Sequence, residues 1–394
     1  MTISDLRQAI PAVGLREYWY PALQDRSVGK KPVGMKILGD DIVFFRGETG
    51  EVAALANTCP HRGGSLMHGD CHFEGTVACP YHGWVFNARG ECLAVLSEGP
   101  ESPIPPMVKT RAYPTRTVRG LVFIWMGEGS PVALEEDVPP EFFEGDETMV
   151  FVVQRQWPIN WRVALENSLD AHVIYVHANS LLMLREPVVQ FGHIGNRVRT
   201  VSGKACVGYM PDAPKPGRQY YPRLNGYWPR SNFRQAWLWM FRQKPWSSYP
   251  PFNHNDEWDM HTFVKGTRVR AGGHHLPSMF RFDYGTHMYT RCCVPIDERT
   301  TRIFYYHAAR RKTALGRLLH RVWFRLFYDW AMHDNFSVQD YRVMAPQRYD
   351  QPEYLSATDS EVVAWRRLLL KARRSPGQQQ NSPGETTESL SPVK

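Results

Sequence analysis

The chain has 394 residues, of which 43% are hydrophobic and 13% aromatic, and its formal net charge is +8. This composition is typical of a soluble globular protein with room for two domains, and it excludes a largely disordered chain. The basic residues are scattered and no nucleic-acid motif is present, so the charge favours an acidic protein partner over a nucleic acid.

Two further features bear on the compartment. Seven cysteines without disulfide-rich spacing predict a reducing environment. The N-terminal stretch MTISDLRQAIPAVGLREYWY lacks the apolar run of a signal peptide, and the longest apolar run, LVFIWM at 121–126, is too short to span a bilayer. A cytoplasmic protein is therefore expected.

Short apolar runs broken by turn signals extend from Tyr18 to about Gly129. Two of them, IVFFRGETGEVAALAN at 42–57 and WVFNARGECLAVL at 84–96, have the pattern of β-hairpins. This part is predicted to be a small all-β module. The proline-rich, acidic stretch at 130–147 is predicted to be a surface connection.

The later part of the chain has a mixed pattern. Helical spacing occurs in WPINWRVALENSLDAHVIYVH at 157–177, strand-like runs with a turn at 297–299 follow in 278–311, and 314–344 is predicted to be a long amphipathic helix. The fold class is α+β. The domains expected are 1–150, 151–372 and a low-complexity, disordered tail at 373–394.

Two short clips in the all-β module carry metal-ligating residues: Cys59-x-His61 and Cys79-x-x-His82. Zinc and an iron–sulfur cluster are the alternatives. A zinc finger usually places both cysteines in one clip and both histidines in the other, whereas each clip here holds one of each. Mixed clips suit a Rieske [2Fe–2S] centre, in which two cysteines bind one iron and two histidines bind the other.

The loops around these clips, CPHRGG and CPYHGW, resemble those of the Rieske family. Rieske proteins of respiratory complexes carry an additional cysteine in each loop, and the two form a disulfide. Gly64 and Tyr81 occupy the matching positions here, so that disulfide cannot form. The resemblance is therefore to the soluble oxygenase type.

A second set of candidate ligands lies in ENSLDAHVIYVH at 166–177, which contains His172 and His177, with Asp340 far downstream in SVQDYRVM. Two histidines and a carboxylate form the facial triad of non-haem Fe(II) oxygenases. Together with REYWYP, VPIDE and EVVAWRRL, these residues make the chain similar to the Rieske non-haem iron oxygenases, nearest in pattern to the carbazole dioxygenase-like homo-oligomeric group.

The resemblance implies that His172, His177 and Asp340 bind a mononuclear Fe(II), and that Asp170 connects the cluster of one subunit to the iron of the next. Asp334 is an alternative third ligand, but the QD context favours Asp340. Asp170 stands closer to His172 than the family pattern has it. The spacing of five between the two histidines calls for a distorted turn such as a π-bulge.

The resemblance further implies a helix-grip catalytic domain with an antiparallel sheet. The expected function is a terminal oxygenase that uses O₂ and electrons from a separate ferredoxin or NAD(P)H-dependent reductase to hydroxylate a hydrophobic, aromatic or polycyclic substrate, as a homotrimer. The alternatives are a demethylase or desaturase of the same family, a Rieske electron carrier without the mononuclear iron and, more distantly, a zinc-binding regulatory module. Nucleic acid is not an expected partner.

Two smaller interpretations complete the sequence picture. Leu276 and Phe280 are candidate walls of a substrate pocket, although such residues are more often plain core. The basic amphipathic segment at 316–330 could contact a membrane, but packing against the catalytic sheet is favoured.

Overall fold

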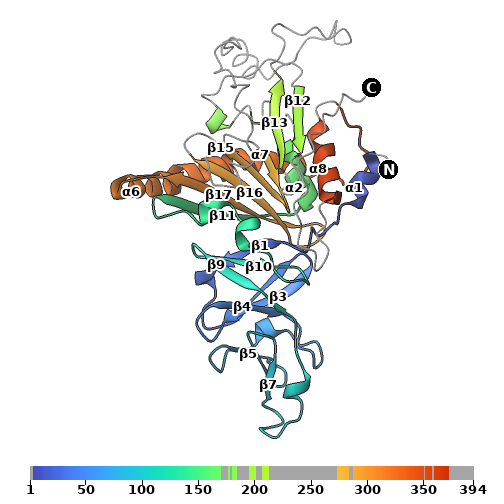
Figure 1. Ribbon diagram of the computed structural model, residues 1–394, viewed down its shortest axis with the longest axis vertical. Helices are drawn as coiled ribbons and strands as arrows, with labels where there is room; N and C mark the ends of the chain where they lie inside the picture. Colours follow the sequence, from blue (N-terminus) through green and yellow to red (C-terminus); the bar gives the residue numbers. More distant parts are fainter. Residues whose placement is uncertain are drawn as a thin grey trace.

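The computed structural model shows an elongated molecule with a β-rich module at one end and a broad antiparallel sheet with its helices at the other (Figure 1). The residues that it describes are 3–169, 176–177, 180–183, 195–200, 206–212, 273–283, 287–349, 351–356 and 359–371. The region from 213 to 272 and the tail at 373–394, for which disorder was predicted, lie outside them.

The N-terminal module consists of three small antiparallel sheets, as the all-β prediction expected. The first has the order β1-β10-β9, the second β2-β3-β4-β8 and the third β5-β6-β7. Both predicted hairpins are confirmed, as β3–β4 and β6–β7. The strands are β1 (Trp19–Gln24), β2 (Val33–Ile37), β3 (Asp40–Arg46), β4 (Val52–Ala56), β5 (Thr76–Ala78), β6 (Trp84–Asn87), β7 (Cys92–Val95), β8 (Ala112–Tyr113), β9 (Thr115–Val118) and β10 (Leu121–Trp125).

Strand β3 explains how this module is held together. Its side chains alternate between the two faces, and both faces are buried, which is why its sequence is an unbroken apolar run. Ile42 and Phe44 pack into the main core of the molecule, whereas Val43 and Phe45 pack into a separate core that includes Cys59 and reaches Cys79. The second core therefore supports the two metal-ligating clips.

The connection at 130–147 is not the plain surface segment that its composition predicted. It contains two 3₁₀ turns, Leu134–Glu136 and Pro140–Phe142, and buries side chains from both. Phe142 packs edge-on against Phe123 of β10, and the carboxylate of Asp137 accepts a hydrogen bond from the backbone of Trp19 at 3.0 Å. The acidic composition concealed these few anchoring residues.

The second half of the molecule is built on a seven-stranded antiparallel sheet of order β11-β17-β16-β15-β14-β13-β12. Strands β11 and β17 pair along ten residues, and the predicted turn at 297–299 joins β16 to β17, closed by a hydrogen bond from Ile296 to Thr300. The strands are β11 (Thr148–Trp157), β12 (Gly195–Thr200), β13 (Cys206–Asp212), β14 (Gly273–His275), β15 (Met279–Asp283), β16 (Met288–Pro295) and β17 (Thr301–Arg310).

The predicted long helix after this sheet is confirmed as a continuous helical segment, with an unexpected interior. It begins as α6 (Ala314–Trp323), continues through two π-helical stretches at Phe324–Tyr328 and Trp330–Phe336, and ends as α7 (Ser337–Met344). Its packing on the sheet includes the ring of Phe324, which stacks on Phe151 of β11 with centroids 4.1 Å apart. Because a π-turn holds an additional residue, the two stretches rotate α7 relative to α6.

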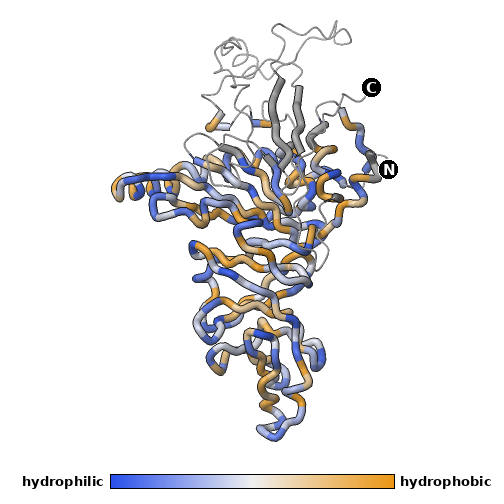
Figure 2. Tube along the Cα trace, in the orientation of Figure 1, coloured by the Kyte–Doolittle hydropathy of each residue, from blue (hydrophilic) through white to orange (hydrophobic). Residues whose placement is uncertain are grey.

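The favoured expectation that segment 316–330 packs on the sheet holds for one of its faces. The other face exposes large apolar side chains, with Leu326 80% exposed. Figure 2 shows hydrophobic and hydrophilic residues alternating along the segment. No helix among the described residues is long and apolar enough to cross a bilayer.

The remaining helices lie at the side of the sheet. Helix α2 (Trp161–Glu166) is capped by Asn160, whose side chain accepts a hydrogen bond from the backbone of Arg162. Helices α1 (Ile3–Ala9) and α8 (Ser360–Lys371) lie side by side near the N-terminus (Figure 1). Arg366 of α8 makes two 2.8 Å contacts with the carboxylate of Glu166, which ties α8 to α2.

Candidate metal centres

The two clips form loops with the same backbone geometry. In the first loop the N–H of Cys59 donates to the carbonyl of Gly64 at 2.8 Å, and the N–H of Gly63 donates to the carbonyl of Cys59 at 2.9 Å. The second loop makes the equivalent pair of hydrogen bonds around Cys79, at 2.8 and 3.0 Å. Gly63 and Gly83 have φ of +75° and +66°, a conformation that favours glycine.

These loops bring the four predicted cluster ligands together in two pairs. Cys59 and Cys79 are only 2% and 3% exposed and their thiols interact, whereas the imidazoles lie further out, His61 being exposed. The Nδ1 atoms of His61 and His82 are 3.1 Å apart. Burial, with a smaller contribution from the thiol of Cys79, raises the pKa of Cys59 to about 11.

This donor set fits a binuclear cluster. Burial and mutual repulsion keep two adjacent thiols protonated, and a bound cation would stabilise both as thiolates. A Rieske cluster takes two sulfur ligands on one iron and two imidazole nitrogens on the other, which is the division that the loops present. A Cβ atom at Gly64 would lie 3.2 Å from the sulfur of Cys79, so glycine keeps this side of the thiol uncrowded.

The second candidate centre lies beneath the large sheet, where α7 brings Asp340 to His177. The Nε2 atom of His177 is 2.8 Å from Oδ1 of Asp340, and the two residues are 0% and 3% exposed. The other ring nitrogen, Nδ1, lies 3.3 Å from Oε1 of Gln339, and Phe336 stacks on the imidazole at 3.6 Å. A proton on Nδ1 donated to Gln339 leaves Nε2 directed at Asp340, as a metal-binding histidine requires.

The segment after His177 is tied to the same helical element. The backbone N–H of Ser180 donates to the carbonyl of His177 at 2.9 Å, and the side-chain oxygen of Asn335 accepts from the backbone of Leu181 at 2.8 Å. The π-helical stretch that contains Asn335 therefore positions His177 as well as Asp340. Among the residues that the structure describes, no group of three potential ligands surrounds a single point.

The choice between the two candidate carboxylates is supported by their surroundings. Asp334 is exposed and forms an ion pair with Arg155 at 3.2 Å, whereas Asp340 is buried beside His177. Asp340 is therefore not a surface carboxylate. Asp170 and His172 lie outside the described residues, so their roles and the distorted turn expected between the histidines stay predictions.

Sequence reasoning missed several polar residues around this centre. Arg291 of β16 has its Nη1 atom 3.9 Å from Oδ2 of Asp340. His307 of β17 and His333 are buried with their Nε2 atoms 3.0 Å apart, and burial lowers the pKa of His333 to about 3. The available signal was an arginine on a strand that otherwise has a buried pattern, since arginine is almost never fully buried unless it is paired.

Of the two predicted pocket walls, Phe280 lies in strand β15 and Leu276 in the turn between β14 and β15. Phe280 of β15 is the cross-strand neighbour of Arg291, and its ring lies 4.9 Å from that of His274. Leu276 and Phe280 are both partly buried against the main core. Their assignment as walls of a substrate pocket stays a prediction.

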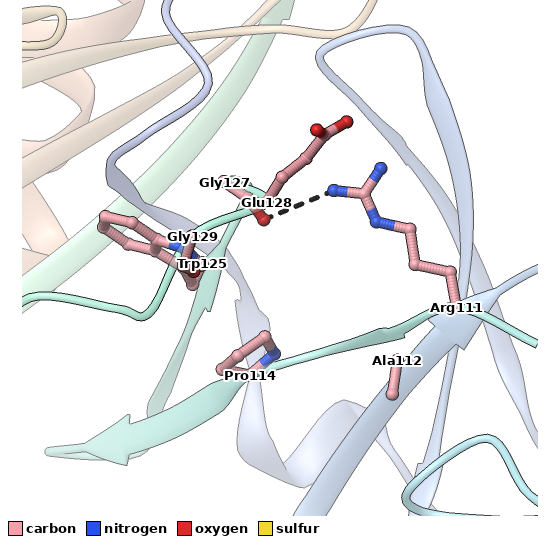
Figure 3. A pocket seen from close by; sticks show the side chains of 7 residues that line it. All are labelled: Arg111, Ala112, Pro114, Trp125, Gly127, Glu128 and Gly129. Atoms are coloured by element: carbon pink, nitrogen blue, oxygen red, sulfur yellow. Dashed lines mark hydrogen bonds between the residues drawn. The ribbon is translucent and has the colours of Figure 1, made fainter. Parts of the chain in front are cut away.

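A surface pocket of about 400 Å³ lies elsewhere, beside β8 and the end of β10. In it the side chain of Arg111 donates to the carbonyl of Gly127 at 3.3 Å (Figure 3). Its lining residues are Arg111, Ala112, Pro114, Trp125, Gly127, Glu128 and Gly129. The pocket shares no residue with either candidate centre and is therefore not their substrate site.

Comparison with known proteins agrees with this division of the molecule. Residues 18–114 match the Rieske [2Fe-2S] domain, and residues 125–202 match the family described as homotrimeric ring hydroxylase. The chain therefore carries one region similar to Rieske [2Fe-2S] domains and one similar to homotrimeric ring hydroxylases, and the two regions together cover less than half of its length.

Individual relatives match the chain over less than half of its length. The chain is 31% identical to the terminal oxygenase component of carbazole 1,9a-dioxygenase from Metapseudomonas resinovorans, over 43% of this chain and 44% of that protein. It is 36% identical to the 3-chlorobenzoate-3,4-dioxygenase oxygenase subunit from Comamonas testosteroni, over 42% of this chain and 39% of that one. The matched regions thus span less than half of each relative.

The fold extends further than these sequence matches. A solved structure of the reduced complex between oxygenase and ferredoxin in carbazole 1,9a-dioxygenase superposes with a TM-score of 0.70 at 20% identity, and the likeness covers 94% of this chain and 92% of that one. At this identity the likeness shows that the fold is shared.

Proposed function

We propose that the chain is the terminal oxygenase component of a Rieske non-haem iron oxygenase system, which uses O₂ and externally supplied electrons to hydroxylate a hydrophobic, aromatic substrate. The observation that carries this proposal is the buried pair of His177 and Asp340, which are far apart in the chain and 2.8 Å apart in space. A Rieske electron carrier that had lost the mononuclear iron would have no need to retain it.

In this proposal each residue has a defined task. Cys59, Cys79, His61 and His82 hold the cluster, and the exposed edge of His61 provides the surface at which an electron enters. His177 and Asp340, with His172, hold the mononuclear iron, while Gln339 fixes the tautomer and orientation of His177. The two metal groups supply the one-electron transfers and the activation of O₂.

The distance between the two candidate centres within one chain supports electron transfer between subunits of an oligomer. The loops that carry the cluster ligands belong to the end of the molecule that contains β5 and β7, remote from the large sheet (Figure 1). We therefore propose that the cluster serves the iron of a neighbouring subunit in a homotrimer, with Asp170 between them. The domain description as a homotrimeric ring hydroxylase favours that assembly.

The electron donor is proposed to be a separate ferredoxin or NAD(P)H-dependent reductase, since the similar solved oxygenase binds a ferredoxin. The net charge of +8 suits an acidic partner of this kind. A cytoplasmic location is also proposed, supported by the free thiols of Cys59, Cys71, Cys79, Cys92, Cys292 and Cys293.

We also propose that the chain divides near residue 150. This boundary is supported by β11, which starts at Thr148 and pairs along its whole length with β17. On this division residues 1–150 carry the Rieske domain and residues 151–372 the catalytic domain.

The test is the iron and acid-labile sulfide content of anaerobically purified protein. The expected result is about three iron and about two sulfide per chain, one iron above the needs of the cluster. About two iron and two sulfide, unchanged after incubation with Fe(II), would contradict the oxygenase proposal and indicate an electron carrier. Zinc in place of iron and sulfide would contradict both.

A further inference from the structure

The feature that carries a further inference is the guanidinium of Arg291. It is the one charged side chain on β16 and is 3% exposed. Its Nη1 atom lies 3.9 Å from Asp340, and its Nε and Nη2 atoms have no hydrogen-bond partner within the described part of the chain. Burying charged N–H groups without acceptors is costly, so a ligand that supplies acceptors would be favoured here.

Asp340 does not meet this demand by itself. Its Oδ1 atom lies 2.8 Å from His177, and only Oδ2 is directed toward Arg291. If the proposed function holds, a metal ion bound by this carboxylate takes up its negative charge. The centre would then combine a cation with an arginine, and within the described part of the chain no second carboxylate lies within ion-pairing distance of the guanidinium.

The surroundings of Arg291 specify what kind of acceptor fits. Cross-strand pairing places Arg291 between Phe280 of β15 and Tyr305 of β17. Tyr289 lies two residues away on the same face of β16, with its ring centroid 6.3 Å from that of Phe280 and 6.0 Å from that of Tyr305. The guanidinium is therefore framed by aromatic rings on one face of the sheet.

From this geometry we propose that Arg291 binds the carboxylate of an aromatic acid substrate and that Phe280, Tyr289 and Tyr305 pack against its ring. The proposal rests on the proposed function and specifies its substrate class. The planar fork of N–H groups on arginine matches the two oxygens of a carboxylate, and such charge-assisted pairs are the strong hydrogen bonds of a desolvated site. The ring would thereby be held beside His177 and Asp340.

The probes are benzoate and benzamide, which have nearly the same shape and differ in charge. Their dissociation constants are measured by titration calorimetry on the full chain, anaerobically loaded with Fe(II) and without reductant. Benzoate is expected to bind at least about tenfold more tightly than benzamide. In Arg291→Gln this preference should disappear, with benzoate weakened about tenfold and benzamide changed by less than about twofold.

Arg302→Gln is the matched control. Arg302 is a buried arginine on the next strand, β17, but it lies on the opposite face of the sheet, where its Nη1 donates to the carbonyl of Lys36 at 3.1 Å. This variant should keep the preference for benzoate. The visible spectrum of the cluster shows whether each variant is folded.

Three results would overturn the proposal. They are equal affinity of the unmodified protein for the two probes, an equal loss of both probes in Arg291→Gln, and binding of inorganic phosphate as tightly as benzoate. The second would show that Arg291 only positions Asp340. If Arg291→Gln does not fold, the wild-type ratio together with Arg291→Lys decides, since the lysine keeps the charge but loses the fork and should show a reduced preference.

The iron count of the same preparations separates this proposal from the proposed function. A preference for benzoate in protein that cannot take up a third iron would support the arginine site and contradict the oxygenase. Full iron content without that preference would leave the oxygenase standing and remove the carboxylate site.

Discussion

The two candidate metal centres are built in opposite ways. The predicted cluster ligands come from two short loops of one small module, and backbone hydrogen bonds inside each loop set their geometry. His177 and Asp340 come from distant segments that meet only because α7 packs under the large sheet. A centre of the first kind is encoded locally, whereas one of the second kind depends on tertiary packing.

The histidines of the two candidate centres also differ in their exposure to solvent. The cluster has buried thiols but places His61 at the surface, where an electron donor can approach. His177 is fully buried and stacked on Phe336. The first arrangement suits exchange of electrons with a partner, and the second suits chemistry from which bulk water is excluded.

The largest effect is expected from His177→Ala, which tests whether the two centres are independent. Loss of a ligand should reduce the mononuclear iron from about one per chain to near zero and abolish oxygenase activity. The visible spectrum of the cluster should remain, because its loops make no use of this segment. Asp334→Asn is the control: it removes an exposed carboxylate near the same helix and should alter stability by at most about 1 kcal/mol.

If His177→Ala also removed the spectrum of the cluster, the idea of two separately assembled centres would be wrong. If Asp334→Asn lost the iron as fully as His177→Ala, the assignment of Asp340 as the third ligand would be contradicted.

A smaller effect is expected from Gln339→Leu, which leaves the ligands in place but removes the acceptor for Nδ1 of His177. Partners of this kind typically contribute about 10- to 100-fold in metal affinity. The affinity for Fe(II) should fall within that range, with the cluster unaffected. Titration with Fe(II) and a competing chelator measures it, and an unchanged affinity would show that Phe336 alone orients the ring.

The sequence was more informative about the candidate cluster site than about the candidate iron site. The mixed Cys/His clips could be recognised as a Rieske site because the ligands and glycines sit at short fixed spacings, and the two hairpins that support them carry clear turn signals. Asp340 could be proposed only through resemblance, since nothing local distinguishes it from Asp334. The sequence did not indicate Arg291, because its place beside Asp340 depends on cross-strand pairing and on a helix far along the chain.

The π-helical stretches show what the spacing of apolar residues cannot predict about a helix. The pattern of residues 314–344 predicted one amphipathic helix, and a helix is present, but its middle holds more residues per turn. The distorted turn expected between His172 and His177 lies outside the described residues and stays a prediction. The π-helical stretches before Asp340 are a separate feature, which the apolar spacing of 314–344 did not indicate.

The last expected effects concern stability and lie within the cluster loops, in Gly63→Ala and Gly83→Ala. Both glycines have positive φ, so each alanine should cost about 1 kcal/mol in backbone strain. The added Cβ meets open space at Gly63 but lies 2.8 Å from Cβ of Leu96 at Gly83. Gly83→Ala should therefore cost about 1–3 kcal/mol more, and truncating Leu96 to alanine should not relieve it, because the clashing Cβ remains.

Thermal loss of the cluster spectrum compares the two variants directly. A lower midpoint for Gly83→Ala than for Gly63→Ala would show that the second loop is fixed against its neighbour, while the first is held only by its own backbone. Equal midpoints would show that the second loop can move away from Leu96. The two loops, which share one hydrogen-bond pattern, would then be equally local in origin, and the difference between the two metal centres would be sharper still.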